Sequence, residues 1–266
     1  MRYYRSNGLQ LIQHSFDTIE KNIAWDETAL TTMKSGRISE LIRLWQVPRR
    51  SVVIGRSQQP EKEVFLHACH RDRVPVIRRF SGGGAVLQGP EVMNYTFILD
   101  LNQHSGLSAI RDYFSHCLRI VTAVLRQAGI RTRIRGHSDL ADAHGRKISG
   151  NALAVRGNAL CVHGTLILAP ITWLCEKYLR YPSSVPEYRA GRQHETFITA
   201  VSEKNSTLDI RSFREILIRE LNLRAVNIHS TGINVPEASL LGKYCHPMWN
   251  NNGKHPQGDC AFGKTA

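Results

Sequence analysis

The residues best suited to chemistry begin with three consecutive glycines, Gly82–Gly84, preceded by Arg79 and Ser81. Glycine lets the backbone approach a ligand closely, and successive backbone N–H groups can point toward negative charge. An arginine beside such a loop adds a fixed cation with planar donors. The pattern therefore favours phosphate or carboxylate binding, and a hairpin turn without a ligand is the alternative.

A second group of candidates surrounds Lys147, which lies in the string Gly145-Arg146-Lys147-Ile148-Ser149-Gly150. If Lys147 begins a strand, its side chain projects to one face, and Gly150 leaves room for a ligand beside the sheet. An isolated lysine in a strand is more often a solvated edge residue. Two further polar clusters, Ser138-Asp139-Leu140 and His163-Gly164-Thr165, make a catalytic lysine the better hypothesis.

These candidates need elements that hold them in place, and hydrophobic periodicity predicts several. The expected helices cover residues 17–34, 62–71, 107–127, 171–179 and 210–221. The expected strands cover residues 41–45, 51–55, 74–78, 85–87, 94–99, 147–155 and 160–168. A turn at 47–49 joins the first two strands, and residues 156–159 join the last two as a hairpin.

The order of these elements predicts the fold class. The glycines connect strand to strand, whereas Rossmann and Walker loops lead from a strand into a helix. Strands and helices are intermixed without regular βαβ alternation, which indicates an α+β domain with a mixed, mainly antiparallel sheet flanked by helices. One catalytic domain over residues 1–249 is the simpler organisation. Residues 250–266 are polar and contain glycine, so we expect them to form a disordered tail.

Composition narrows the class of protein. The 266 residues carry 35 Lys plus Arg against 22 Asp plus Glu, a net charge of +13, which favours an anionic partner. The basic residues are scattered and match no zinc-finger or leucine-zipper pattern, which argues against nucleic acid. The six cysteines form no C-x-x-C pair, and no window approaches the ~18 apolar residues of a membrane span. We therefore expect a cytoplasmic protein without a membrane partner.

The ordered motifs of the chain closely resemble those of lipoate-protein ligases. The matching strings are Arg78-Arg79-Phe80-Ser81-Gly82-Gly83-Gly84-Ala85-Val86, Ser138-Asp139-Leu140, Gly145-Arg146-Lys147-Ile148-Ser149-Gly150 and His163-Gly164-Thr165-Leu166. Val52 to Gln58 upstream, and Lys243-Tyr244 with Trp249-Asn250 downstream, are similar to the same family. The resemblance extends from residue 23 to residue 250 and implies a fold shared with biotin ligases.

The resemblance also implies an activity. Such ligases activate lipoate with ATP and Mg²⁺ to lipoyl-adenylate and pass the lipoyl group to a lysine of a lipoyl carrier domain. Lys147 would be the catalytic residue, and Asp139 would bind Mg²⁺ or orient that lysine. The residues implied to bind nucleotide and acyl group are Arg79, Ser81, Gly82, Gly83, Gly84, Ala85, Val86, Leu87, Asn94, Asp139, Lys147, Gly150, His163, Gly164 and Thr165. A cation at Lys147 suits this chemistry because adenylation gathers negative charge on the α-phosphate.

Two departures from the family pattern carry expectations of their own. Many of these ligases have a histidine and an aspartate after the Ala-Val pair, whereas this chain has Leu87-Gln88-Gly89-Pro90, so contacts on the adenine side should differ. The longer bacterial ligases append a C-terminal accessory domain, which the residues after Lys243 are too few to form. A separate accessory protein would replace it, or the enzyme acts alone.

Two alternatives to a ligase remain. The related octanoyltransferases use a cysteine nucleophile and an acyl carrier protein without ATP. Cys161 is the cysteine nearest the motifs and shares a strand face with His163, so a Cys/His pair is conceivable. A buried structural cysteine is the favoured interpretation of Cys161. The other alternative is a protein that binds lipoate or nucleic acid without turnover.

Overall fold

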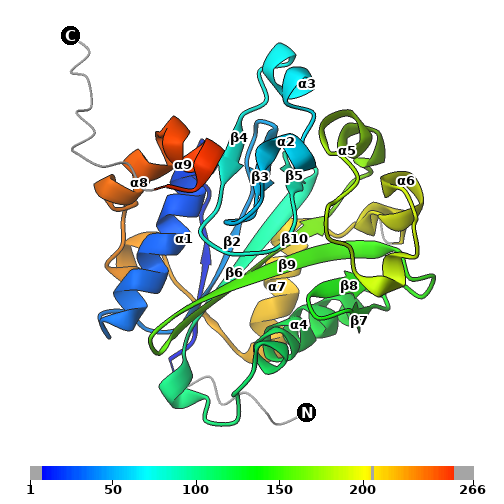
Figure 1. Cartoon of the computed structure of the whole chain (residues 1–266). Coiled ribbons are helices and arrows are strands. Elements are labelled where there is room, and N and C mark those ends of the chain that lie inside the picture. Colours follow the sequence, from blue (N-terminus) through cyan, green and yellow to red (C-terminus); the bar gives the residue numbers. More distant parts are fainter. Residues whose placement is uncertain (1–7, 205–206, 255–266) are drawn as a thin grey trace.

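The computed structural model describes residues 8–204 and 207–254. The protein is built around an eight-stranded sheet in the order β11-β1-β2-β6-β10-β9-β8-β7, and a three-stranded sheet, β4-β3-β5, lies beside it (Figure 1). The strands are β1 (Gln10–Gln13), β2 (Leu41–Trp45), β3 (Ser51–Ile54), β4 (Val76–Arg78), β5 (Val86–Gln88), β6 (Val92–Asp100), β7 (Arg133–Arg135), β8 (Asp139–Ala141), β9 (Lys147–Arg156), β10 (Ala159–Ile167) and β11 (Arg224–Ala225).

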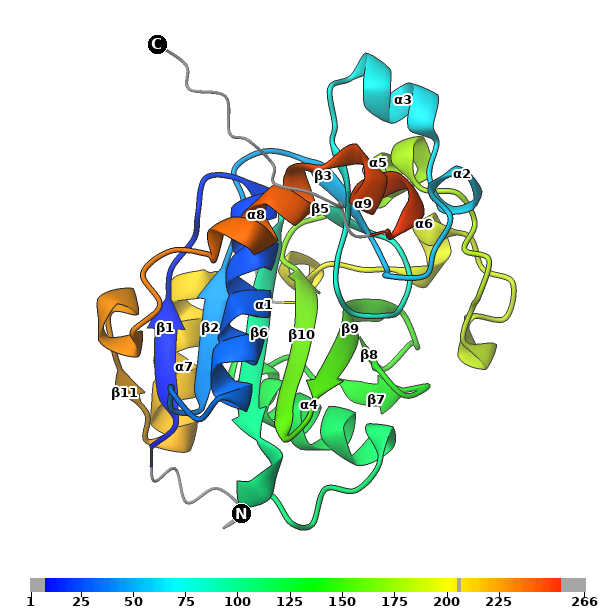
Figure 2. The same cartoon turned by 60° about the vertical axis from the view of Figure 1, so that its left-hand side comes forward.

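Helices cover both faces of the large sheet. Helix α1 packs on one face, and α4 and α7 pack on the other (Figure 2). The α-helices are α1 (Ile19–Lys34), α2 (Pro60–Glu63), α3 (Leu66–Arg71), α4 (Ile110–Gln127), α5 (Thr172–Tyr178), α6 (His194–Phe197), α7 (Ile210–Leu221), α8 (Ala238–Cys245) and α9 (Pro247–Asn252). None of the helices within the described ranges combines the length and apolar character needed to cross a bilayer.

Side-chain alternation along the strands produces these layers. Leu11 and Ile42 belong to the core beneath α4 and α7, whereas their chain neighbours Ile12 and Leu41 belong to the core beneath α1. Successive side chains of a strand point to opposite faces, so a strand buried on both faces is apolar throughout. Strand β2 is buried on both faces, so Arg43 in the middle of it is fully buried although it is charged.

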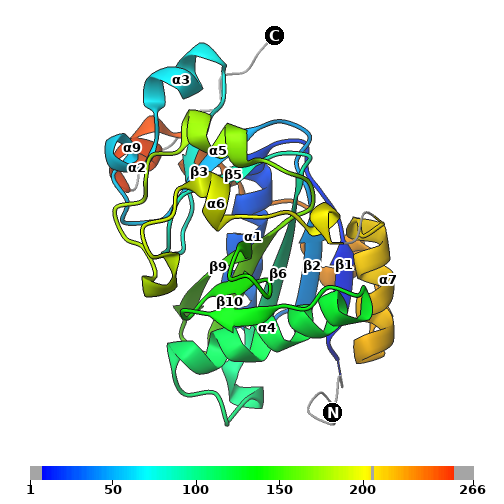
Figure 3. The same cartoon turned by 90° about the vertical axis from the view of Figure 1, so that its right-hand side faces the viewer.

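The expected fold class is confirmed. Strands β11, β1 and β2 run parallel, and the remaining pairs of the large sheet are antiparallel. The glycine loop does connect strand to strand, since β4 and β5 flank it and both pair with β3. The three-stranded sheet lies at one end of the molecule with α5 and α6 (Figure 3).

Several boundaries differ from the expectations. The turn near Pro48 leads from β2 into β3, but these strands belong to different sheets. The helix expected at 62–71 is divided into α2 and α3, because Val64 between them is extended and pairs with Leu179. The tail expected from residue 250 is helical at its start, since α9 runs to Asn252. Residues 255–266 of that tail lie outside the described part of the chain.

Candidate active site

A cavity of about 550 Å³ lies between the glycine loop, strands β9 and β10, and the segment from residue 182 to 198. The structure brings thirteen of the fifteen expected site residues to its wall: Arg79, Gly83, Gly84, Ala85, Val86, Leu87, Asn94, Asp139, Lys147, Gly150, His163, Gly164 and Thr165. Ser81 and Gly82, at the start of the glycine loop, are not part of the lining. Sequence motifs far apart in the chain thus converge on one cavity.

Lys147 begins strand β9 as expected, and its side chain is one-quarter exposed. Its Nζ lies 2.9 Å from Oδ1 of Asp139, whose Oδ2 accepts a 2.8 Å hydrogen bond from the hydroxyl of Tyr188. A Cβ atom at Gly150 would lie 2.6 Å from the lysine Nζ, so a larger residue there would push the end of the lysine away from this position. The ammonium group is therefore held in a fixed position at the cavity wall.

The glycine loop has an unusual backbone that its sequence permits. Gly83 has φ +87°, a conformation that favours glycine, and its carbonyl oxygen lies 2.0 Å from where a Cβ on Gly55 would stand. Arg79 donates from Nε to Ser81 Oγ and to the carbonyl of Gly82, so it fastens the loop from within. Burial lowers the pKa of Arg79 to about 10, which still leaves it cationic at neutral pH.

Arg78 points away from the cavity and holds the base of the loop. Its guanidinium donates to the carbonyls of Gly55, Arg56 and Gln58 on one side and of Trp249, Asn250 and Asn251 on the other. The indole of Trp249 donates in return to the carbonyl of Arg78. Helix α9 is thereby tied to β4, which explains why the chain remains ordered past residue 250.

Buried Ser81 and half-buried His163, which lines the cavity, form a hydrogen-bonded pair beside the glycine loop. The distance from Ser81 Oγ to His163 Nε2 is 2.5 Å, and Arg79 also donates to the same oxygen. Burial, with a smaller contribution from the charge of Arg79, lowers the pKa of His163 to about 3. The imidazole is therefore neutral under physiological conditions and acts as a polar wall rather than as a cation.

This pKa predicts a pH effect on stability. A histidine whose pKa is about 3 when folded and 6.5 when unfolded stabilises the fold fully above pH 6.5, and that contribution is lost as the pH falls toward 3. His163→Gln should therefore flatten the decline in unfolding free energy over this window. Urea unfolding of both proteins at several pH values measures it, and superimposable pH profiles would show that His163 is not buried as a neutral base.

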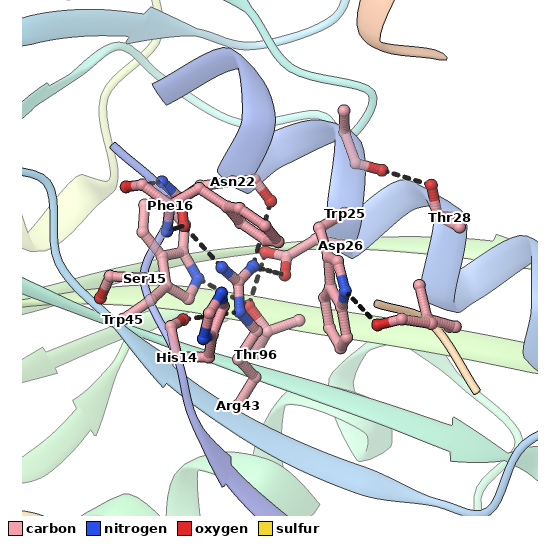
Figure 4. Close-up of polar contacts among 12 residues, drawn as sticks. His14, Ser15, Phe16, Asn22, Trp25, Asp26, Thr28, Arg43, Trp45 and Thr96 are labelled. Carbon is pink, nitrogen blue, oxygen red and sulfur yellow. Dashed lines mark hydrogen bonds and ion pairs between the residues drawn. The ribbon is translucent and has the colours of Figure 1, made fainter. Parts of the chain in front are cut away.

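One wall of the cavity is held by a buried ion pair (Figure 4). Arg43 NH1 lies 2.7 Å from Asp26 Oδ1, and NH2 donates to Oδ1 of Asn22. Asp26 Oδ2 accepts from Thr96 Oγ1 at 2.7 Å, and that hydroxyl accepts a 3.3 Å bond from the indole of Trp45. Trp45 lines the cavity, so the network fixes α1, β2 and β6 where they form its apolar wall.

The carboxylates offer no ready-made metal cage. Asp139 and Glu187 are the acidic side chains among the described residues of the lining, and Asp139 already contacts Lys147 and Tyr188. No cluster of three His, Cys, Asp or Glu suited to a metal occurs within residues 8–204 and 207–254. Magnesium commonly binds through one or two carboxylates and substrate phosphates. The side chains thus suit a metal that arrives with a phosphate ligand better than a resident ion.

Gln88, at the position of the family departure, makes a closed pair with Asn94. Each amide donates to the other's oxygen, at 2.8 and 2.9 Å, and both side chains are buried at the cavity wall. The pair satisfies these groups without a ligand. It also keeps this part of the wall neutral.

The structure places Cys161 as a buried structural cysteine, which is the interpretation that the sequence favoured over a Cys/His pair. Cys161 is fully buried in the core beneath α1 and does not line the cavity, and burial raises its pKa well above the usual value. Cys175, which the sequence did not single out, does line the cavity, and burial raises its pKa to about 12. A cysteine nucleophile reacts as the thiolate. Neither residue is therefore poised as one.

Sequence patterns missed part of the lining, including Trp45 and Arg189. Arg189 is 3% exposed and lies between the rings of Tyr181 and Phe197, and its NH2 has no hydrogen-bond partner among the described residues. An irregular segment carries it, so no periodicity distinguishes it. A buried guanidinium with a free donor would suit an anionic ligand.

The comparison of sequences decides the family. The sequence profile of the lipoyl protein ligase A/B catalytic domain matches residues 18–222, which is most of the chain. The chain belongs to this family. A probable lipoate-protein ligase A of Mycoplasma pneumoniae is 27% identical over 249 residues, covering 92% of this chain and 68% of that protein. Across the curated relatives compared, the chain spans 35% to 68% of their length.

Solved structures confirm the lipoate-protein ligase fold. A bi-partite lipoate protein ligase from Thermoplasma acidophilum, studied with its E2 lipoyl domain, superposes with a TM-score of 0.76 at 22% identity, covering 94% of this chain and 98% of that one. A lipoate-protein ligase A bound with ATP gives a TM-score of 0.74 at 23% identity, covering 91% and 98%. At these identities the agreement concerns the fold.

Proposed function

We propose that this protein activates lipoate with ATP and transfers the lipoyl group to a lysine of a carrier domain. The observation that carries the proposal is the meeting of the glycine loop and Lys147 across one cavity of about 550 Å³. Membership of the lipoyl protein ligase family supports it. The ATP-bound ligase of similar fold supports ATP as the co-substrate.

In the first step a carboxylate oxygen of lipoate attacks the α-phosphorus of ATP. The bond from that phosphorus to the bridging oxygen breaks, and pyrophosphate leaves with the electron pair. Negative charge builds on the α-phosphate oxygens, where the Lys147 ammonium and the loop N–H groups would stabilise it. Asp139 fixes the lysine before substrates arrive, which reduces the reorganisation needed at the transition state. Mg²⁺ that arrives with ATP, as part of that substrate, would offset charge on the leaving group.

In the second step the amine of the acceptor lysine attacks the carbonyl carbon of the adenylate. The amide forms, AMP leaves with the electron pair, and the nitrogen loses a proton. Lys147 would polarise the carbonyl oxygen during this attack. The acyl chain needs apolar surface, and Ile19, Ile23 and Trp45 provide it on the α1 side of the cavity.

We also propose that the residues up to α9 form one catalytic domain and that a separate accessory protein assists it. The tie between Arg78 and α9 supports the first part. The similar T. acidophilum enzyme is described as bi-partite, which supports the second. Adding such a partner should raise the rate of transfer.

A reconstituted reaction tests the function. The protein is incubated with lipoate, Mg·ATP and an apo lipoyl domain, and AMP release and the mass of the domain are followed. We expect both AMP and a lipoylated domain. No AMP and no mass change, with or without an accessory protein, would contradict the proposal.

The variant Cys161→Ala separates the ligase from an octanoyltransferase. Because Cys161 is buried away from the cavity, its loss should leave ATP-dependent ligation within about twofold of wild type. A matched assay supplies octanoyl-carrier protein without ATP. Transfer in that assay, abolished by Cys161→Ala, would favour the acyltransferase instead.

A further inference from the structure

An exposed row of arginines lies on the edge of the large sheet beside the cavity. Among the described strands, β7 is the last of the sheet and pairs with β8 alone. Arg131, Arg133 and Arg135 are exposed at every second position, whereas Ile134 packs into the core beneath α4. Alternation therefore puts Arg133 and Arg135 on the face opposite α4.

That face is the face of the active site. Arg135 lies opposite Asp139 in the β7–β8 register, and both residues line the cavity with Lys147. The row thus begins at the cavity wall and continues outward along the edge to Arg131. The five residues from Arg131 to Arg135 span ~13 Å when extended, which is the scale of a contact between two protein surfaces rather than of one small anion.

The acidic groups nearest the row are already engaged. Asp139 contacts Lys147, and Asp142 contacts both Arg146 and Lys204. Within the described part of the chain, no ion pair or side-chain hydrogen bond involves Arg131, Arg133 or Arg135. The edge therefore presents guanidinium groups that lack partners, together with a strand edge of the kind that can accept another chain.

We propose that the β7 edge, defined as Arg131, Arg133 and Arg135, is the docking surface for an acidic carrier domain. The inference rests on the proposed function. An acceptor lysine approaching Lys147 and Arg135 carries the same charge as both, so carboxylates beside that lysine are needed to make the approach favourable. Arginine binds carboxylates with paired N–H donors, and surface charge of this kind raises the association rate.

The test removes two charges that lie outside the cavity lining. The test variant carries Arg131→Ser and Arg133→Ser. The control variant carries Arg219→Ser and Arg224→Ser, which remove one exposed arginine from α7 and one from β11, the opposite edge of the sheet. The probe is an apo lipoyl domain of net negative charge, with a second version in which the acids beside its target lysine are replaced by amides. Both variants should form lipoyl-adenylate at the wild-type rate without a carrier.

We expect the β7 double variant to lose about tenfold in kcat/KM for the acidic carrier and to lose most of its salt dependence, whereas the control variant stays within about twofold. The amide version of the carrier should reduce the wild-type rate and leave the β7 variant unaffected. Equal carrier kinetics for the two double variants would overturn the inference. The inference would also be overturned if the β7 double variant lost retention on a DNA column while its kinetics with the carrier stayed unchanged. That outcome would identify the β7 edge as a nucleic-acid surface.

Direct binding of the carrier, measured by calorimetry without ATP or lipoate, separates the two proposals. A protein that makes no adenylate but binds the acidic domain through the β7 edge contradicts the proposed function and keeps the inference. A protein that ligates normally and binds the domain equally well after Arg131→Ser and Arg133→Ser keeps the function and contradicts the inference.

Discussion

Lys147→Ala should lower the rate of lipoyl-adenylate formation by about 10²–10³-fold, the effect of removing one preorganised charge-stabilising donor from an active site. The lysine is fixed over Gly150 and held by Asp139, so its charge is already in place when the α-phosphate becomes more negative. Single-turnover formation of the adenylate from lipoate and ATP, without carrier, measures this step alone.

The matched controls for this prediction use the same contacts. Lys147→Arg keeps the charge but cannot occupy the same space beside Gly150, so we expect a partial loss. Asp139→Asn keeps the size of the side chain and weakens the fixation of the lysine, so kcat should fall more than KM rises. Lys147→Ala leaves the buried Asp139 carboxylate without its cation but with the hydrogen bond from Tyr188, so the melting temperature should fall by only a few degrees and the protein should stay folded. Full turnover in a folded Lys147→Ala protein would remove the lysine from the proposed role.

Local periodicity was sufficient to predict the elements whose stability is largely local. The apolar stripes of α1 and α4 and the hairpin of β9 and β10 lie within a few residues of their expected positions. Strands β1, β7, β8 and β11 were missed, whereas the equally short β3, β4 and β5 were predicted from the Val-rich runs that contain them. The missed strands exist through pairing with distant segments, which no local pattern records.

The site was predictable only where motifs mark it. The glycine loop, Lys147, Asp139 and His163 were selected in advance, and the structure brings them together. Their mutual contacts could not be predicted, because Ser81 meets His163 across 82 positions of sequence and Arg78 meets Asn250 across 172. The exposed arginines of β7 were equally hidden, since only the sheet order shows that their strand is an edge.

Arg43 is the clearest case of a residue whose environment the sequence concealed, and it leads to the second large prediction. Arg43→Met should lower the free energy of unfolding by about 3–5 kcal/mol, because it leaves the buried Asp26 carboxylate without its cation. Urea unfolding at neutral pH measures the loss. The double variant Arg43→Met with Asp26→Leu removes both charges, so it should recover a large part of that stability. If the double variant were less stable than Arg43→Met alone, the uncompensated Asp26 carboxylate would not be the cause of the stability loss.

The loss of unfolding free energy in Arg43→Met should depend on pH, and the burial of Asp26 determines the sign of this dependence. Burial already raises the pKa of Asp26 in the native protein, and removing Arg43 raises it further, because the guanidinium is the nearest charge that favours the ionised form. A carboxyl whose folded pKa exceeds its unfolded pKa stabilises the fold at low pH and loses that contribution as the pH rises. The deficit of Arg43→Met relative to wild type should therefore shrink as the pH falls from neutral toward acid. The network also holds Trp45 at the cavity wall, so the variant should raise KM for the acyl acid. KM for ATP should change little, because the proposed phosphate contacts are with Lys147 and the glycine loop.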